Sequence, residues 1–271
     1  MTQLSAYATG MTRTNIEEAL RSVGKDPSAI EPGDLAALEE FHTLGRLATA
    51  QLAHLADIGP NDRVLDAGTG IGGSARFLAV EHGCSVTGVD LTDEYCDTAR
   101  WINESAGLSD RIAIVQGDIT DLPFDAGSFD VVVSQHVQMN VVDKGSLYDE
   151  ACRVLAPGGR LAMWDITGNA DHIGYPVPWA TDPADSHVVS GDQLRAAVAG
   201  AGFRIEQWND LTRPTAEMMT AFLSRPASEL GLHVFVPDFP AKVANMLRGF
   251  AAGYLQVIQA LAVRPPDTGS S

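Results

Sequence analysis

Apolar residues near the N-terminus recur at the spacing of one helix face. Over residues 14–58 they follow one another mostly at three- and four-residue steps, with Gln51 as a polar exception. The turn residues Pro32-Gly33-Asp34 interrupt this run, and Asp34 is a suitable helix N-cap. The pattern therefore predicts two N-terminal helices within residues 14–58, the second of them beginning at Leu35.

From Arg63 onward the pattern changes to short apolar runs that alternate with helical stretches. These runs lie at 64–65, 86–89, 112–115, 131–133 and 161–163. A helix over 191–201, stopped by Gly202, precedes a sixth strand at 203–208, and a closing strand is expected at 254–263. Such alternation is typical of the α/β class, in which a mostly parallel sheet, here of seven strands, is covered by helices on both faces.

Two segments do not fit this alternation and are expected to cap the sheet. Residues 168–190 contain the proline-rich stretch Tyr175-Pro176-Val177-Pro178-Trp179, which favours a loop over a regular element. Residues 212–250 are mostly helical in pattern and rich in Met and Phe. Residues 168–190 are therefore expected to form a loop over the site.

Composition narrows the classes of partner. The 18 basic and 35 acidic residues give a net charge of −17, which repels phosphate backbones and anionic headgroups, so neither nucleic acid nor a membrane is expected as partner. The chain has three cysteines, Cys84, Cys96 and Cys152, and their spacing is not that of a zinc site. Neither a disulfide framework nor a metal site is therefore expected. With no signal peptide or long apolar run evident, the cytoplasm is the expected location.

The strongest motif is the segment 64–73, where a strand ends in Asp66 and runs into a turn with Gly68, Gly70 and Gly72. Glycines allow the backbone to turn sharply and to approach a ligand closely. Dinucleotide enzymes use a similar turn, but with G-x-G-x-x-G spacing in place of the G-x-G-x-G found here. Asp66 would repel a pyrophosphate and suits a positively charged amino group.

Two further acidic residues follow strands. Asp90 ends the strand 86–90, 24 residues after Asp66, where it can accept hydrogen bonds from both hydroxyls of a ribose. This feature is shared with NAD enzymes and does not discriminate between the classes. Asp118 comes after the next strand and can accept from an adenine amine while Ile119 packs on the ring.

Together with the segments 129–136 and 153–161, these motifs resemble the class I S-adenosylmethionine-dependent methyltransferases over about residues 40–210. The resemblance implies a Rossmann-like sheet with S-adenosylmethionine as cofactor. It places residues 1–60 as helices covering the cofactor site, residues 61–264 as the methyltransferase domain with the two cap insertions, and 265–271 as a flexible tail. The cofactor-binding residues are then expected to be Asp66, Gly68, Thr69, Gly70, Asp90, Leu91, Asp118, Ile119 and Gln135.

Within that superfamily, the segments 40–46, 135–140 and 176–180 are similar to small-molecule enzymes, which include sarcosine and dimethylglycine N-methyltransferases and natural-product O- and N-methyltransferases. Many of these carry a His-His pair where this chain has Met139 and Asn140. The expected activity is methyl transfer to a small molecule, slightly favouring an amine nitrogen over a hydroxyl. The main alternative is a methyltransferase-like fold that catalyses another reaction, such as a cyclisation, or only binds its ligand; an NAD-dependent dehydrogenase is a third, less favoured one.

The expected catalytic residue is His136, which follows the fourth strand at the edge where open α/β sheets bind ligands. Its ordinary pKa of about 6.5 suits a general base, and Asp165 at the end of the fifth strand is placed to orient it. The alternative role for His136 is a polar residue of the cofactor wall. His42, Met139, Tyr175 and Trp179 are the candidates for the acceptor pocket, although aromatic and Met residues are more often core.

Overall fold

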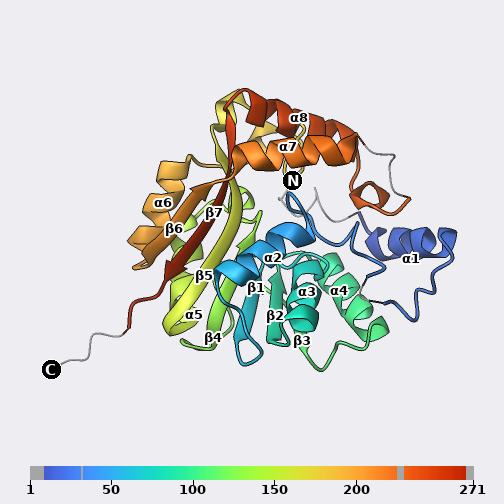
Figure 1. The fold of residues 1–271 in the computed structure, drawn as a ribbon, viewed down its shortest axis with the longest axis horizontal. Coiled ribbons are helices and arrows are strands. Elements are labelled where there is room, and N and C mark those ends of the chain that lie inside the picture. The colour runs from blue at the N-terminus through green and yellow to red at the C-terminus, as the bar shows by residue number, and fades with distance from the viewer. Residues whose placement is uncertain (1–8, 32, 225–228, 267–271) are drawn as a thin grey trace.

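The computed structural model describes residues 9–31, 33–224 and 229–266. At its centre is a seven-stranded sheet in the order β3-β2-β1-β4-β5-β7-β6 (Figure 1). The strands are β1 Arg63–Ala67, β2 Ser85–Asp90, β3 Ile112–Gln116, β4 Phe129–Gln135, β5 Leu155–Gly168, β6 Arg204–Asp210 and β7 Leu255–Val263. Strands β1 to β5 pair in parallel and β7 runs antiparallel to both β5 and β6. The predicted mostly parallel, seven-stranded α/β fold is confirmed.

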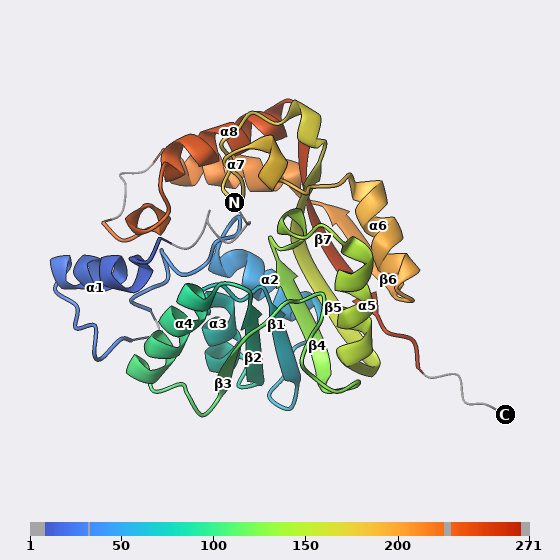
Figure 2. The same cartoon turned by 180° about the vertical axis from the view of Figure 1, so that it is seen from behind.

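Helices cover both faces of the sheet and its carboxyl edge. The helices of the described residues are α1 Thr12–Ser22, α2 Arg46–Leu55, α3 Gly73–Glu81, α4 Asp93–Ser105, α5 Lys144–Val154, α6 Gly191–Gly200, α7 Thr212–Leu223 and α8 Phe239–Ala251. Val131 and Val133 of β4 pack in one core cluster with α2, α3 and α8, whereas Val132 packs on the opposite face with α5 and α6 (Figure 2). Successive strand side chains point to opposite faces, so a strand that is apolar throughout is covered on both.

The cap lies across the carboxyl ends of the parallel strands, where α7 and α8 pass over the sheet (Figure 1). Helix α1 packs beside α4, with Ile16 and Leu20 fully buried against Tyr95 and Ile102. No helix among the described residues is long and apolar enough to cross a membrane. The expected tail falls mostly outside the described part of the chain, which ends at residue 266.

The second N-terminal helix differs from the prediction. It begins only at Arg46, and residues 33–45 form turns in which Leu44 and Gly45 have φ values of 67° and 50°. Leu35 and Leu38 are nevertheless buried, although the segment that carries them is irregular and not helical. The expected helix from Leu35 is therefore wrong, because the spacing reflected burial and not helical backbone.

A buried ion pair holds this irregular segment to helix α3. Arg76 of α3 donates from Nε and Nη2 to Oε2 of Glu39 at 3.0 and 2.9 Å, and both residues are 3% exposed. Arg46 donates to the other oxygen of Glu39. The backbone comes so close here that a Cβ on Gly73 would lie 2.3 Å from the carbonyl oxygen of Glu39. Residues 39–43 are therefore fixed against the N-terminus of α3.

We expect Glu39→Ala to destabilise the protein by about 3 to 5 kcal/mol, because it leaves the buried guanidinium of Arg76 without its counter-charge. Glu217→Ala is the matched control, since Glu217 pairs with Arg213 on the surface at side-chain exposures of 64% and 88%. Such an exposed pair contributes about 0 to 1 kcal/mol. Urea unfolding measures both. Equal losses in the two variants would show that the buried pair does not hold the segment.

Candidate active site

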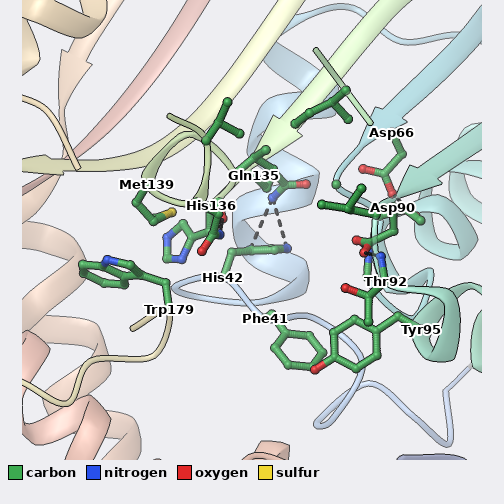
Figure 3. Close-up of a pocket in the computed structure, with 18 of the residues that line it drawn as sticks. Phe41, His42, Asp66, Asp90, Thr92, Tyr95, Gln135, His136, Met139 and Trp179 are labelled. Atoms are coloured by element: carbon green, nitrogen blue, oxygen red, sulfur yellow. Dashed lines mark hydrogen bonds between the residues drawn. The ribbon is translucent and has the colours of Figure 1, made fainter. Parts of the chain in front are cut away.

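A cavity of about 390 Å³ opens at the carboxyl ends of β1, β2 and β4. Its walls come from the N-terminal segment 39–42, from the loops that follow these strands, and from both cap segments (Figure 3). Carboxylates are frequent among the described lining residues: Glu39, Glu40, Asp66, Asp90, Asp118 and Asp143. Segments far apart in the sequence therefore meet around one acidic hollow.

The glycine-rich turn forms one wall of this cavity. The amides of Gly68 and Thr69 both donate to the carbonyl of Val89, which folds the turn back over β2. Gly68 has φ +80°, and a Cβ there would lie 2.5 Å from Cγ2 of Val137. Only glycine fits both the backbone angle and the space.

Asp66 ends β1 and is 2% exposed at the cavity wall. Burial raises its pKa to about 6, while the hydrogen bond that Thr69 Oγ1 donates at 2.6 Å acts in the opposite direction. Glu40 and Asp90 raise the pKa further by charge repulsion. A ligand cation beside Asp66 would relieve this unfavourable negative charge.

Asp90 supports the glycine-rich turn from β2. Its Oδ2 accepts from the amide of Gly70 at 2.8 Å and its Oδ1 from the amide of Thr92 at 2.9 Å. Burial raises its pKa and these backbone donors lower it, the burial effect being the larger. Each carboxylate oxygen has two lone pairs, so Asp90 can still accept from a ligand.

The expected adenine end of the cavity is more open. Asp118 is exposed, and its Oδ1 accepts from both the amide and the hydroxyl of Thr120. Both bonds leave lone pairs of the carboxylate available to a ligand. Leu91, which is 46% exposed, and Ile119 line the cavity beside it.

A cluster of polar side chains lies between the N-terminal segment and β4. His42 Nε2 is 3.0 Å from Oε2 of Glu40 and 3.1 Å from the amide nitrogen of Gln135. The other carboxylate oxygen of Glu40 lies 3.9 Å from Nε of Arg46 and accepts no hydrogen bond from a described residue, although it is buried. Glu40 was not predicted as a site residue, although His42 in the same expected helix was. No signal in the helical spacing distinguishes it from a surface glutamate.

His136 follows β4 with φ +55°, a backbone conformation that is uncommon outside glycine. The amide of Thr43 donates to its Nε2 at 3.4 Å, and Thr43 Oγ1 lies 3.2 Å from the same atom. Trp164 of β5 donates to that hydroxyl at 2.8 Å. Burial, with a further contribution from His42, holds the pKa of His136 well below its ordinary value. The imidazole is therefore neutral, and its Nε2 accepts a hydrogen bond from Thr43.

Asp165 does not orient the His136 ring, so this part of the prediction is wrong. Its Oδ2 accepts from the amides of Val137 and Gln138 at 3.3 and 3.2 Å, and its Oδ1 from the amide of Ile166. Burial raises the pKa of Asp165 to about 7. Asp165 lies on β5 beside the end of β4, and its carboxylate therefore meets the backbone of the loop that follows β4. It supports that backbone and does not line the cavity.

Of the four expected acceptor-pocket residues, His42, Met139 and Trp179 line the cavity and Tyr175 does not. Tyr175 packs against the core instead, with its hydroxyl buried and without a partner among the described residues. Trp179 is held by a hydrogen bond from its Nε1 to Oγ of Ser186 at 2.9 Å. The insertion 168–190 thus contributes its later part to the wall, while Tyr175 faces inward.

A family model described as a methyltransferase domain matches residues 65–163. Methyltransferase GfsG of Streptomyces halstedii is 32% identical over 200 residues, which cover 70% of this chain and 68% of that protein. The glycine/sarcosine/dimethylglycine N-methyltransferase of Actinopolyspora halophila is 35% identical over 127 residues. These cover 47% of this chain but only 22% of that larger protein.

A solved structure shows the same arrangement of strands and helices. Geranyl diphosphate C-methyltransferase from Streptomyces coelicolor A3(2), in complex with Mg²⁺, geranyl diphosphate and S-adenosyl-L-homocysteine, is 25% identical with a TM-score of 0.61. The match covers 81% of this chain and 80% of that one. The glycine-rich turn with its flanking carboxylates, and the identity to GfsG over two thirds of both chains, show that this chain belongs to the S-adenosylmethionine-dependent methyltransferases.

Proposed function

We propose that the protein transfers a methyl group from S-adenosylmethionine to a small-molecule acceptor bound in the same cavity. The observation that carries this proposal is the division of the cavity into an acidic part, walled by the glycine-rich turn, and a part walled by the cap (Figure 3). When bound, the cofactor supplies a methyl group on a sulfonium sulfur, which the acceptor takes with a lone pair while giving up a proton. The protein has to bind, orient and desolvate the two ligands.

The acidic part fits the charges of this cofactor. Asp66 is a buried carboxyl group at the cavity wall without a Lys or Arg partner among the described residues, so it favours a ligand ammonium or sulfonium. The bare backbone at Gly68 and Gly70 allows close approach. Asp90 and Asp118 keep acceptor positions free for the ribose hydroxyls and the adenine amine.

The acceptor part is closed by residues of the cap. Trp179 comes from the insertion 168–190 and Phe239 from the start of α8. Both bring apolar surface to the cavity and keep water out. Exclusion of water strengthens the electrostatic interactions within such a site and prevents side reactions.

The atom that is methylated was expected to be a nitrogen, with a slight preference. The N-methyltransferase of Actinopolyspora halophila supports this choice, although it shares only part of its length with this chain. The geranyl diphosphate enzyme methylates carbon, according to its name. Nitrogen therefore stays a prediction, and the cavity itself gives further information on the acceptor.

Methyl transfer is tested with cofactor carrying a tritium-labelled methyl group and a panel of uncharged phenols, alcohols and amines. We expect label in an organic product, with one S-adenosylhomocysteine formed for each methyl transferred. Asp90→Ala is the control that loses activity, because it removes charge-assisted acceptors worth about 1.5 to 3 kcal/mol in cofactor binding. Conversion of an acceptor without release of S-adenosylhomocysteine would instead support a cyclase or another non-methylating reaction.

Cofactor affinity should depend on pH through Asp66. Its folded-state pKa of about 6 lies above the ordinary value of 3.8, so the carboxyl stabilises the cofactor-free protein when protonated and loses this contribution as pH rises through 6. The cationic cofactor prefers the ionised form. Its affinity should therefore fall by up to about tenfold for each pH unit below 6.

Asp66→Asn removes this titration. We expect the variant to bind the cofactor more weakly at pH 7.5, to lose the pH dependence between 5 and 7.5, and to be more stable than the parent without cofactor at pH 7.5. Calorimetric titration and thermal unfolding measure the two effects. A pH dependence retained in Asp66→Asn would assign the titration to another group.

Gly68→Ala should weaken cofactor binding by at least about tenfold, because the new Cβ must displace Val137 and the turn at the cavity wall. Gly107→Ala is the matched control. Gly107 also has a positive φ, of 67°, but it is exposed, and a Cβ added there would meet nothing within 4 Å. Both variants carry the same backbone strain, so equal binding in the two would refute a role of the turn in the cofactor site.

A further inference from the structure

The charge of the cavity limits what the acceptor can be. None of the described residues that line it is Lys or Arg, whereas six are Asp or Glu. An acceptor that carries a carboxylate or a phosphate would lack a counter-charge among these lining side chains. Amino-acid and phosphorylated acceptors therefore do not suit this site.

The acceptor part of the cavity is walled largely by apolar side chains from three segments, which are the loop after β4, the insertion 168–190 and the start of α8. Figure 3 shows His136, Met139 and Trp179 together on the side away from Asp66 and Asp90. The wall continues with Val141, Val142, Pro178 and Phe239. Val142 is 74% exposed, which is unusual for an apolar side chain beside a cavity and places apolar surface at its rim. These walls suit a largely apolar molecule.

His136 lines this side together with the polar residues Asn140 and Asp143. The surroundings of the His136 ring determine which of its nitrogens carries the proton. Because the amide of Thr43 donates to Nε2, that nitrogen must be an acceptor. Thr43 Oγ1 already accepts from Trp164, so its own proton is free to be donated to Nε2 as well. A neutral imidazole that accepts at Nε2 carries its proton at Nδ1.

The Nδ1 atom is left for a ligand. The hydrogen bonds of the ring with described residues are all made at Nε2, and Nδ1 has none. The ring itself lines the cavity. His136 therefore presents a hydrogen-bond donor and has no free lone pair with which to take a proton from an acceptor.

We infer that the acceptor is an uncharged, largely apolar molecule with an oxygen that accepts a hydrogen bond from Nδ1 of His136. Thr43 is the positioning residue that fixes this tautomer. An oxygen suits this donor better than an aliphatic amine, which is protonated in water near neutral pH and then has no lone pair. The inference rests on the proposed function only in placing an acceptor beside the cofactor.

The tautomer can be measured without any substrate, by nitrogen-15 NMR of histidine-labelled protein with His136 assigned through His136→Phe. We expect the neutral form with its proton on Nδ1. Thr43→Val should lower the population of this form, because one donor to Nε2 is lost, and Thr43→Ser should restore it. A proton on Nε2, or an imidazolium, in the parent protein at pH 7 would overturn the inference.

The acceptor class is tested by calorimetric titration of the S-adenosylhomocysteine complex with 2-naphthol, 2-naphthoate and sarcosine. We expect 2-naphthol to bind at least tenfold more tightly than either the anionic or the zwitterionic probe. His136→Phe should weaken 2-naphthol by about fivefold, the value of one neutral hydrogen bond. His54→Phe, at an exposed position of α2, is the matched control and should bind like the parent.

Equal or tighter binding of 2-naphthoate or sarcosine, or failure of 2-naphthol to bind, would contradict the inferred acceptor class. These outcomes are distinct from failure of the proposed function. If 2-naphthol binds with the expected dependence on His136 but no acceptor receives labelled methyl, then the site is as inferred and the proposed reaction is wrong.

Discussion

The active site depends on a buried ion pair that is not itself part of the chemistry. Glu39 and Arg76 hold the turn segment 33–45 against the start of α3. Glu40, His42 and Thr43 follow directly and reach the cavity or its wall only because this segment is fixed there. Burying two charges costs solvation free energy, which their mutual contact and the second arginine offset. The pair is thus a structural requirement for the cofactor wall and for the orientation of His136.

The cavity holds buried carboxyl groups that favour a bound cation. Burial raises the pKa of Asp66 and of Asp90, and the neighbouring charges of Glu40 and Asp90 raise the pKa of Asp66 further. This arrangement destabilises the protein without its cofactor and favours a positively charged ligand. Stability and function are therefore opposed at this site, as they often are where charged groups are held for a ligand.

His136 combines three constraints from separate parts of the chain. Its backbone has a positive φ, its amide donates to the carbonyl of Trp164, and its Nε2 accepts from Thr43. Asp165 holds the next two amides of the same loop. A neutral imidazole fixed in this way is suited to orient an acceptor, and a proton released during the reaction has to leave by another route, such as water at the open rim.

Local sequence determined the parts of this protein that depend on short-range chemistry. Strand positions followed from apolar runs, and the turn with Gly68 and Gly70 between Asp66 and Asp90 indicated the cofactor edge, because glycine freedom and strand-end carboxylates are properties of adjacent residues. Only the tertiary structure decided that residues 33–45 are not a helix and that Tyr175 faces the core. It also decided that Asp165 accepts from the loop backbone and that the amide of Thr43 donates to Nε2 of His136. Each of these depends on which partner a side chain meets across the fold, and residue spacing carries no information on such contacts.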